Sequence, residues 1–316
     1  MADRVFLGLT GASGILLVVV LGGILFSLAA GAWPAFRRYH LGFLFGTNWD
    51  PVHQRFGALP FVFGTAVTSA VALFLAVPIA IGLAVLLNEF APPKIAVPLA
   101  VFVDVLAAIP SVVYGLWGLF VLVPLMTSHV EPFLTDTIGK IPLIGLVFRG
   151  TPTGGDLFTA GVILAIMILP IVTAISREVV AAVPREVHEA AKALGATRYE
   201  SIRMGVLPTA RSGLIGAAVL GLGRALGETI AVSMVVGGGR SVGAQLFSSG
   251  STIPSVIASQ FLNAQPVGYQ RPALLALGLI LVVIALLLAA SSRALVSRVA
   301  AETAAPALAP PLEVTG

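Results

Sequence analysis

Apolar residues dominate this chain in long runs that alternate with short polar segments. Six runs are each long enough for a membrane-spanning helix, which needs about 20 consecutive apolar residues. The pattern therefore predicts an all-α membrane protein with one transmembrane domain over residues 1–298. The expected spans cover residues 5–32, 61–87, 98–125, 157–178, 209–236 and 272–293. Residues 299–316 lack an apolar period, so we expect a disordered tail.

The first apolar run has a second interpretation as a secretory signal peptide. Ala30-Gly31-Ala32 would offer the small-residue cleavage site that such a peptide needs. The apolar region of a signal peptide, however, spans about 7–15 residues, which is shorter than this run. We therefore expect a retained first span.

The composition excludes an ordinary soluble protein, because 58% of the residues are hydrophobic and only 10% are charged. The net charge of +4 could suggest a nucleic-acid partner. In a chain this apolar, cytoplasmic loops that retain Lys and Arg explain the charge more simply, and we predict no nucleic acid. The chain has no cysteine, and its four histidines lack the spacing of metal ligands. We expect neither a metal site nor another cofactor.

The charged segment 184–208 stands out between two apolar runs. Pro184 suits the first turn of a short helix, and Gly195 suits its end, where a left-handed residue is favoured. Thr197 and Glu200 have the spacing of a capping box at the start of a second helix. The segment thus predicts two short helices between membrane spans.

Within that segment, the order of residues resembles the EAA loop of ABC importer permeases. Glu189-Ala190-Ala191 is followed after three residues by Gly195, and after nine more by Gly205-Val206-Leu207-Pro208. Gly205 stands where the family usually has Ile. The resemblance implies a cytoplasmic coupling helix that docks on an ATP-binding subunit, whereas an ordinary basic loop is the simpler alternative. The residues to which we assign ATPase coupling are Glu186, Glu189, Ala190, Ala191, Leu194, Gly195, Leu207 and Pro208.

The fifth span carries an arginine about 20 Å from its start, within the hydrocarbon region. An intramembrane Arg costs at least about 2.5–3.5 kcal/mol, so Arg224 should face a partner or a water-filled path. Glu228 follows one turn later and could pair with it. Either the two residues neutralise each other at a helix interface, or Arg224 offers positive potential to a passing anion.

The third span contains Pro110, which must kink or break a helix. Asp104, Ser111 and Gly115 fall on one face at helical spacing and give the span a small, polar stripe. We assign Asp104 and Ser111 to a translocation pathway together with Arg224 and Glu228. A cap or packing role for Asp104 stays an equal alternative.

Three further stretches resemble the PstC-type permease subunits of phosphate ABC importers. They are FGALPFVFGTAVTS from Phe56, AAIPSVVYGLWG from Ala107 and GLGRALGETIAV from Gly221. The resemblance implies a fold like that of type I ABC importer permeases and a pathway shared with a PstA-like permease subunit. It also implies a PstB-like ATPase homodimer and a periplasmic PstS-like binding protein as partners.

The chain itself contains no G-x-x-x-x-G-K-[ST] loop and no hydrolase motif, so we predict no catalytic residues. ATP hydrolysis would belong to a partner, and this chain would be a phosphate transport subunit rather than an enzyme. With segment 184–208 inside, more Lys and Arg residues fall on the cytoplasmic side than outside. We expect both termini in the cytoplasm and the protein in the lipid of the bacterial inner membrane. The alternatives are a permease for another oxyanion such as molybdate or sulfate, the PstA-like sister subunit, and an ATPase-independent channel.

Overall fold

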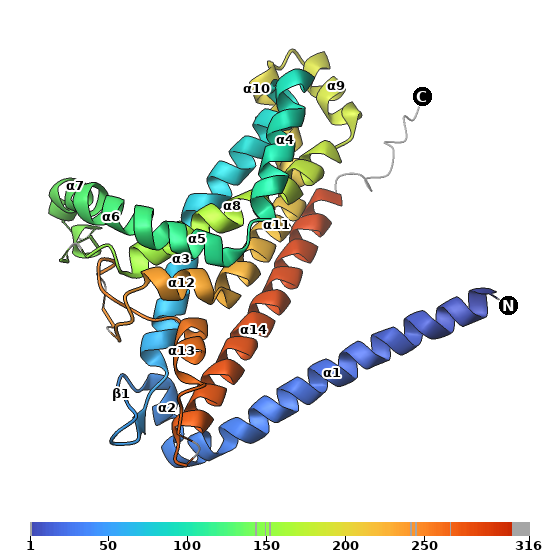
Figure 1. Cartoon of the computed structure of the whole chain (residues 1–316). Coiled ribbons are helices and arrows are strands. Elements are labelled where there is room, and N and C mark those ends of the chain that lie inside the picture. Colours follow the sequence, from blue (N-terminus) through green and yellow to red (C-terminus); the bar gives the residue numbers. More distant parts are fainter. Residues whose placement is uncertain are drawn as a thin grey trace, which may run out of the picture.

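Helices form most of the chain in a computed structural model, which describes residues 2–304 except 143, 149, 152, 241, 244 and 266 (Figure 1). The α-helices are α1 (Ala2–Tyr39), α2 (Gly42–Phe45), α3 (Leu59–Val85), α4 (Pro93–Ala107), α5 (Ser111–Trp117), α6 (Val123–Leu125), α7 (Glu131–Thr137), α8 (Leu157–Ala181), α9 (Arg185–Ala193), α10 (Arg198–Ser201), α11 (Leu207–Gly227), α12 (Ile230–Val235), α13 (Ile253–Gln260) and α14 (Gln270–Ala304). The antiparallel strands β1 (Trp49–Asp50) and β2 (Arg55–Phe56) form a small hairpin. Short π-helical and 3-10 turns continue several helices, namely η1 (Leu86–Phe90), η2 (Gly118–Leu122), η3 (Met126–Val130), η4 (Ile138–Lys140), η5 (Ile144–Leu146) and η6 (Ile202–Val206).

Six helical stretches of the described residues are long and apolar enough to cross a membrane, so this is a multi-pass membrane protein. They are Phe6–Tyr39, Leu59–Phe90, Ser111–Lys140, Leu157–Ala181, Arg198–Gly227 and Gln270–Ala294.

The third of these stretches differs from the span expected over 98–125. The chain breaks after α4, and Pro110 takes an extended conformation immediately before α5. The break expected at Pro110 is confirmed, since a proline cannot continue the helical hydrogen bonding. The expected single span was wrong, because α4 is a separate helix and the long apolar stretch begins at Ser111. Asp104 and Ser111 therefore do not share one helical face.

Two further boundaries differ from expectation. The helix expected over 209–236 ends at Gly227, and Glu228 adopts an extended backbone before α12 begins. At the other end of the chain, α14 continues through residues 299–304, which we expected to be disordered. The rest of the expected tail, residues 305–316, lies outside the described residues.

The centre of the fold is α8, which packs on α3, α4, α11 and α12. Small residues allow this close packing: a Cβ on Gly161 of α8 would lie 2.5 Å from a methyl group of Val71 on α3. A second cluster of buried side chains joins the hairpin to α13 and α14. There Trp49 stacks edge to face on Phe56 at 4.9 Å, and its indole N–H donates to Gln260.

Different elements form the two ends of the bundle (Figure 1). Helices α9 and α10 lie with α4 at one end, and α2 lies with the hairpin at the other. Helix α1 leaves the bundle near α2 and diverges from it, so that its first half stands apart. Its only extensive packing within the described residues is against α14.

Candidate functional site

The segment 184–208 forms an exposed helical loop at one end of the bundle. Pro184 precedes α9 in an extended conformation, and α9 ends in a Schellman motif. In that motif the Gly195 N–H donates to the Lys192 carbonyl at 2.9 Å and the Ala196 N–H donates to the Ala191 carbonyl at 3.1 Å. Gly195 has φ +80°, a conformation that side chains disfavour. The predicted helix end is confirmed.

The second helix of the loop begins as its sequence predicts. The Thr197 hydroxyl accepts a hydrogen bond from the Glu200 N–H, and the Glu200 carboxylate accepts one from the Thr197 N–H. This reciprocal pair is the expected capping box. It fixes the angle at which the chain turns from α9 into α10.

Four of the residues assigned to coupling surround one groove of about 570 Å³ between α9 and η6. They are Ala190, Ala191, Leu194 and Gly195. Leu194 projects from the end of α9 with 90% of its surface exposed. A protruding leucine beside small residues is a surface to which another protein can bind.

The other four assigned residues lie away from this groove. Glu186 and Glu189 are exposed on α9, while Leu207 and Pro208 form the first turn of α11. The assigned set therefore divides into the groove, the outer surface of α9 and the base of the next membrane helix.

Gly205, which replaces the usual Ile of the resembling loop, contacts α9. A Cβ at this position would lie 2.9 Å from a methyl group of Val187. Because contacts under about 3.0 Å force neighbouring atoms to shift, a larger residue would displace Val187 or α9. The glycine thus allows α9 to pack closely on η6.

Arg224 and Glu228 do not form the expected i,i+4 pair. Helix α11 ends between them, and the described part of the chain contains no ion pair that joins them. The Glu228 carboxylate instead accepts a hydrogen bond from the Ala231 N–H at 3.3 Å, at the start of α12. A negative charge is favourable at a helix N-terminus, and a positive one such as Arg224 is favourable in the last turn of α11. The expectation of a pair was wrong because the helix does not continue.

The two residues differ in exposure as well. Glu228 is 9% exposed, whereas Arg224 is exposed on α11. Since Glu228 does not neutralise it, the Arg224 guanidinium is a cation in the last turn of a membrane helix.

Within the described residues, Asp104 forms an ion pair with a residue other than Arg224 or Glu228. The Asp104 carboxylate lies 3.5 Å from the Arg177 guanidinium, so it connects α4 to the end of α8. Ser111 is half-buried in the first turn of α5. Helix α5 approaches α12 closely, because a Cβ on Gly115 would lie 2.9 Å from the Ala231 Cα. Asp104 thus connects to α8, whereas Ser111 lies on the helix that packs on α12, which begins just after Glu228.

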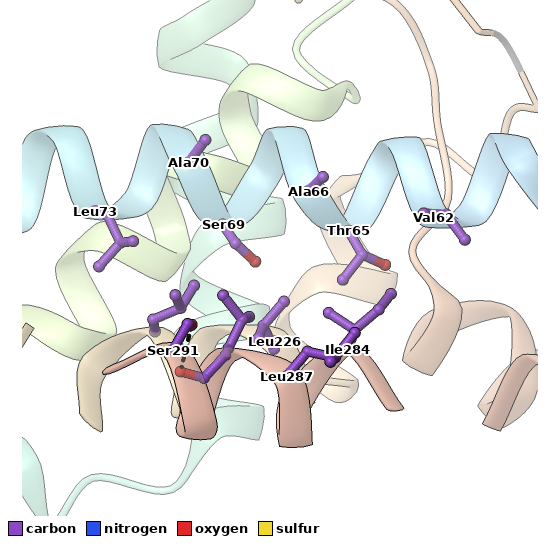
Figure 2. A pocket seen from close by; sticks show the side chains of 12 residues that line it. Val62, Thr65, Ala66, Ser69, Ala70, Leu73, Leu226, Ile284, Leu287 and Ser291 are labelled. Atoms are coloured by element: carbon purple, nitrogen blue, oxygen red, sulfur yellow. Dashed lines mark hydrogen bonds between the residues drawn. The ribbon is translucent and has the colours of Figure 1, made fainter. Parts of the chain in front are cut away.

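A groove of about 660 Å³ lies between α3, α11 and α14 (Figure 2). Ser69 and Thr65 point into it from α3, Ser291 lines it from α14, and apolar side chains of the three helices line the rest. Leu222 and Leu226 lie four residues apart on one side of α11, while Arg224 falls between them on the opposite side. This groove contains no charged side chain and does not suit an anion, and Arg224 lies on the other side of α11.

Sequence reasoning missed a buried acidic pair. Glu131 begins α7 and Asp156 precedes α8, and neither side chain is exposed. Both accept hydrogen bonds from Thr159, whose N–H donates to Asp156 at 2.9 Å and whose hydroxyl donates to Glu131 at 3.4 Å. Burial raises the pKa of the Asp156 carboxyl. The sequence did offer one indication of this pair, because two acidic residues lie at the ends of one loop in a chain with few charges.

The comparison with protein families gives one match. Residues 76–301 match the family described as the binding-protein-dependent transport system inner membrane component.

Curated proteins similar to this chain include phosphate transport permeases. The "Phosphate transport system permease protein PstC" of Haemophilus influenzae is 42% identical over 296 residues, which cover 94% of this chain and 93% of that protein. The protein of the same name from Mesorhizobium japonicum is 42% identical over 305 residues, which cover 96% of this chain and 93% of that protein.

Solved structures of similar fold are more distant in sequence. A chain of a bacterial alginate ABC transporter is 16% identical with a TM-score of 0.58, covering 91% of this chain and 94% of that one. A chain of the inward-facing MetNI methionine ABC transporter is 20% identical with a TM-score of 0.53, covering 77% and 95%. These likenesses support the fold of type I ABC importer permeases.

Proposed function

Since the chain belongs to the family of binding-protein-dependent transport system inner membrane components, we propose that it is the permease subunit of an ATP-driven phosphate importer. The substrate rests on relatives that are named phosphate transport permeases and match more than nine-tenths of both chains. The observation that supports coupling to an ATPase is the exposed loop of α9 and α10, in which no described residue buries the side chain of Leu194.

The loop would bind a groove on an ATPase subunit. An exposed apolar side chain flanked by small residues can enter a partner's pocket with little steric conflict, and large exposed apolar groups commonly mark interaction sites. Leu194, Ala190 and Ala191 would provide that contact, while Glu186 and Glu189 would meet polar groups at its edge.

Arg224 would supply positive potential to a passing phosphate. It is exposed on the side of α11 away from the apolar groove, and no ion pair within the described residues neutralises it. Intramembrane cations that face a cavity commonly mark ion pathways. Glu228, whose carboxylate accepts the Ala231 N–H, would hold the break between α11 and α12 in place.

A second permease subunit would complete the pathway. The first half of α1 exposes a continuous apolar surface that includes Phe6, Leu16 and Leu21. Lipid and a partner's helices both suit such a surface. We propose a PstA-like partner, a PstB-like ATPase homodimer at the α9 end and a PstS-like binding protein at the hairpin end. The α9 end and both termini would face the cytoplasm of a bacterial cell, with the chain in its inner membrane.

Transport would proceed by alternating access. The loaded binding protein would dock on the outer loops, and ATP binding would close the ATPase dimer. That closure would move α9 and open the pathway outward, and hydrolysis would return it to the inward state.

The test is the ATPase activity of the co-expressed complex in lipid, with and without a phosphate-loaded binding protein. Stimulation by the loaded binding protein is the expected result. Stimulation by molybdate or sulfate with their binding proteins, but not by phosphate, would reassign the substrate. A chain that purifies without an ATPase subunit would contradict the proposal.

A further inference from the structure

The last turn of the second membrane helix is a π-helix, η1, that continues α3. Three consecutive residues of this turn are Asn88, Glu89 and Phe90, which we call the clasp. Successive helical side chains point in different directions, so three neighbours can reach three different elements. Short π-helical segments within α-helices often occur at functional sites.

The central contact of the clasp joins α3 to α9. Both carboxylate oxygens of Glu89 lie 3.2 Å from the Nε2 atom of His188. The side chains are 13% and 25% exposed, respectively, so water competes only partly for this contact. It is the one side-chain hydrogen bond within the described residues between α9 and a membrane helix.

Asn88 and Phe90, on either side of Glu89, contact the helices that precede and follow α9. The Asn88 amide donates to the Arg177 carbonyl at 2.7 Å, near the end of α8. The Phe90 ring lies 5.1 Å from the Arg198 guanidinium in α10, within the range of a cation–π contact. The clasp therefore contacts the helix before α9, α9 itself and the helix after it.

Helix α9 has little else to hold it to the bundle. None of its side chains is fully buried, and only Val187, His188 and Ala191 are half-buried. Val187 packs close to Gly205 of η6, and it shares one buried apolar cluster with Ile81 and Val85 of α3, which lie in the turns before the clasp. Within the described residues, the contacts of α9 with the bundle are thus the packing of Val187 and the hydrogen bond between Glu89 and His188, and this hydrogen bond joins α9 to the end of the second membrane helix.

From these contacts we infer that the clasp makes α3 follow α9 when the loop is displaced, with Glu89 and His188 as its principal positioning residues. This inference rests on the proposed function, in which a partner ATPase moves α9. Displacement of α9 pulls on Glu89 and hence on the end of α3. Through Arg177 the same movement reaches Asp104 on α4.

The test compares Glu89→Ala, His188→Ala, the double variant and Glu89→Gln in the complete complex in lipid vesicles. Phosphate uptake and ATP hydrolysis are measured in the same sample. Each single alanine variant should move fewer phosphate ions per ATP, by roughly 2- to 30-fold, the range expected when a coupling network is cut. The double variant should be no worse than either single variant, because both remove the same contact. Glu89→Gln should retain more transport, since an amide can still hydrogen-bond to His188.

Glu178→Ala is the matched control, because Glu178 is an exposed acid near the end of α8 whose carboxylate makes no hydrogen bond or ion pair within the described residues. Glu178→Ala should leave the number of phosphate ions moved per ATP unchanged. Unchanged ratios in Glu89→Ala and His188→Ala, or additive losses in the double variant, would overturn the inference. Loss of the ATPase subunit in proportion to lost uptake would also overturn it, because Glu89 would then serve assembly only.

Hydrogen exchange of the α9 amides separates this inference from the proposed function. Glu89→Ala should speed that exchange even if the wild-type complex transports no phosphate. Equal exchange rates in the variant and the wild type would reject the clasp. A wild type without phosphate transport would reject the proposed substrate instead.

Discussion

Replacement of Gly195 tests whether the end of α9 matters for coupling. A residue with a side chain at φ +80° carries a penalty of roughly 1–2 kcal/mol, and a β-branched residue such as Val lies at the upper end. No atom lies within 4 Å of a Cβ built at Gly195, so steric contacts add nothing to this penalty. The cost of Gly195→Val is therefore conformational and local.

That penalty is large for a helix held by so few contacts. Since 1.4 kcal/mol corresponds to a factor of ten, it shifts the population of the native turn by roughly 5- to 30-fold. The two hydrogen bonds of the Schellman motif at Gly195 and Ala196 would open, and Leu194 would lose its fixed position. Both hydrogen bonds lie between residues 191 and 196, so the membrane helices should stay folded when these bonds open.

The assay measures hydrogen exchange in α9, co-purification of the ATPase subunit and phosphate moved per ATP. Gly195→Val should speed exchange around residues 190–196 and lower both of the other quantities. Gly195→Asn should lie close to the wild type, because Asn tolerates the left-handed conformation.

Gly216→Ala in α11 is a matched control for Gly195→Ala, because a Cβ at Gly216 also meets no atom within 4 Å. Inside a helix the same substitution stabilises by roughly 0.5–1 kcal/mol, whereas at Gly195 it should destabilise. Normal exchange, co-purification and transport in Gly195→Val would refute the reasoning.

Three other predictions follow from the site. Arg224→Gln should cut phosphate uptake while the complex still co-purifies, and Arg224→Lys should retain part of the uptake; intact uptake with a dissociated complex would show a structural role instead. Gly205→Ile should destabilise the loop by about 1–3 kcal/mol through overpacking against Val187, seen as weaker ATPase co-purification, and an unchanged complex would contradict the close packing. Asp156→Asn should weaken the pH dependence of thermal stability. Burial raises the folded-state pKa of Asp156, so its stabilisation is full below the unfolded value of about 3.9 and is lost as pH rises through the folded pKa. Equal slopes of Tm against pH in variant and wild type would exclude this contribution.

Local interactions made part of the fold predictable from sequence. The end of α9 and the capping box depend on residues no more than five positions apart, so Gly195, Thr197 and Glu200 suffice to predict them. The six membrane helices depend on apolar length, which composition reports directly.

Features that depend on contacts between residues far apart in the sequence could not be predicted. The break after Gly227 accompanies the packing of α12 on α5, where Gly115 meets Ala231. A continuous apolar pattern does not reveal that contact and predicts one unbroken helix. The i,i+4 pair of Arg224 and Glu228 was therefore predicted wrongly. The partner of Asp104 is Arg177, which lies on another helix and could not be chosen by spacing. The role of Arg224 stays a prediction.

The packing of α1 on α14 has a consequence for biosynthesis. Helix α1 finds its main neighbour within the described chain in α14, which is synthesised more than 200 residues later. Because a contact between the two ends of a chain carries a high loop-closure cost, this docking should be among the slowest steps of maturation. Until α14 is inserted, α1 would lack its main contact within this chain, and a chain truncated before α14 would leave α1 without that contact.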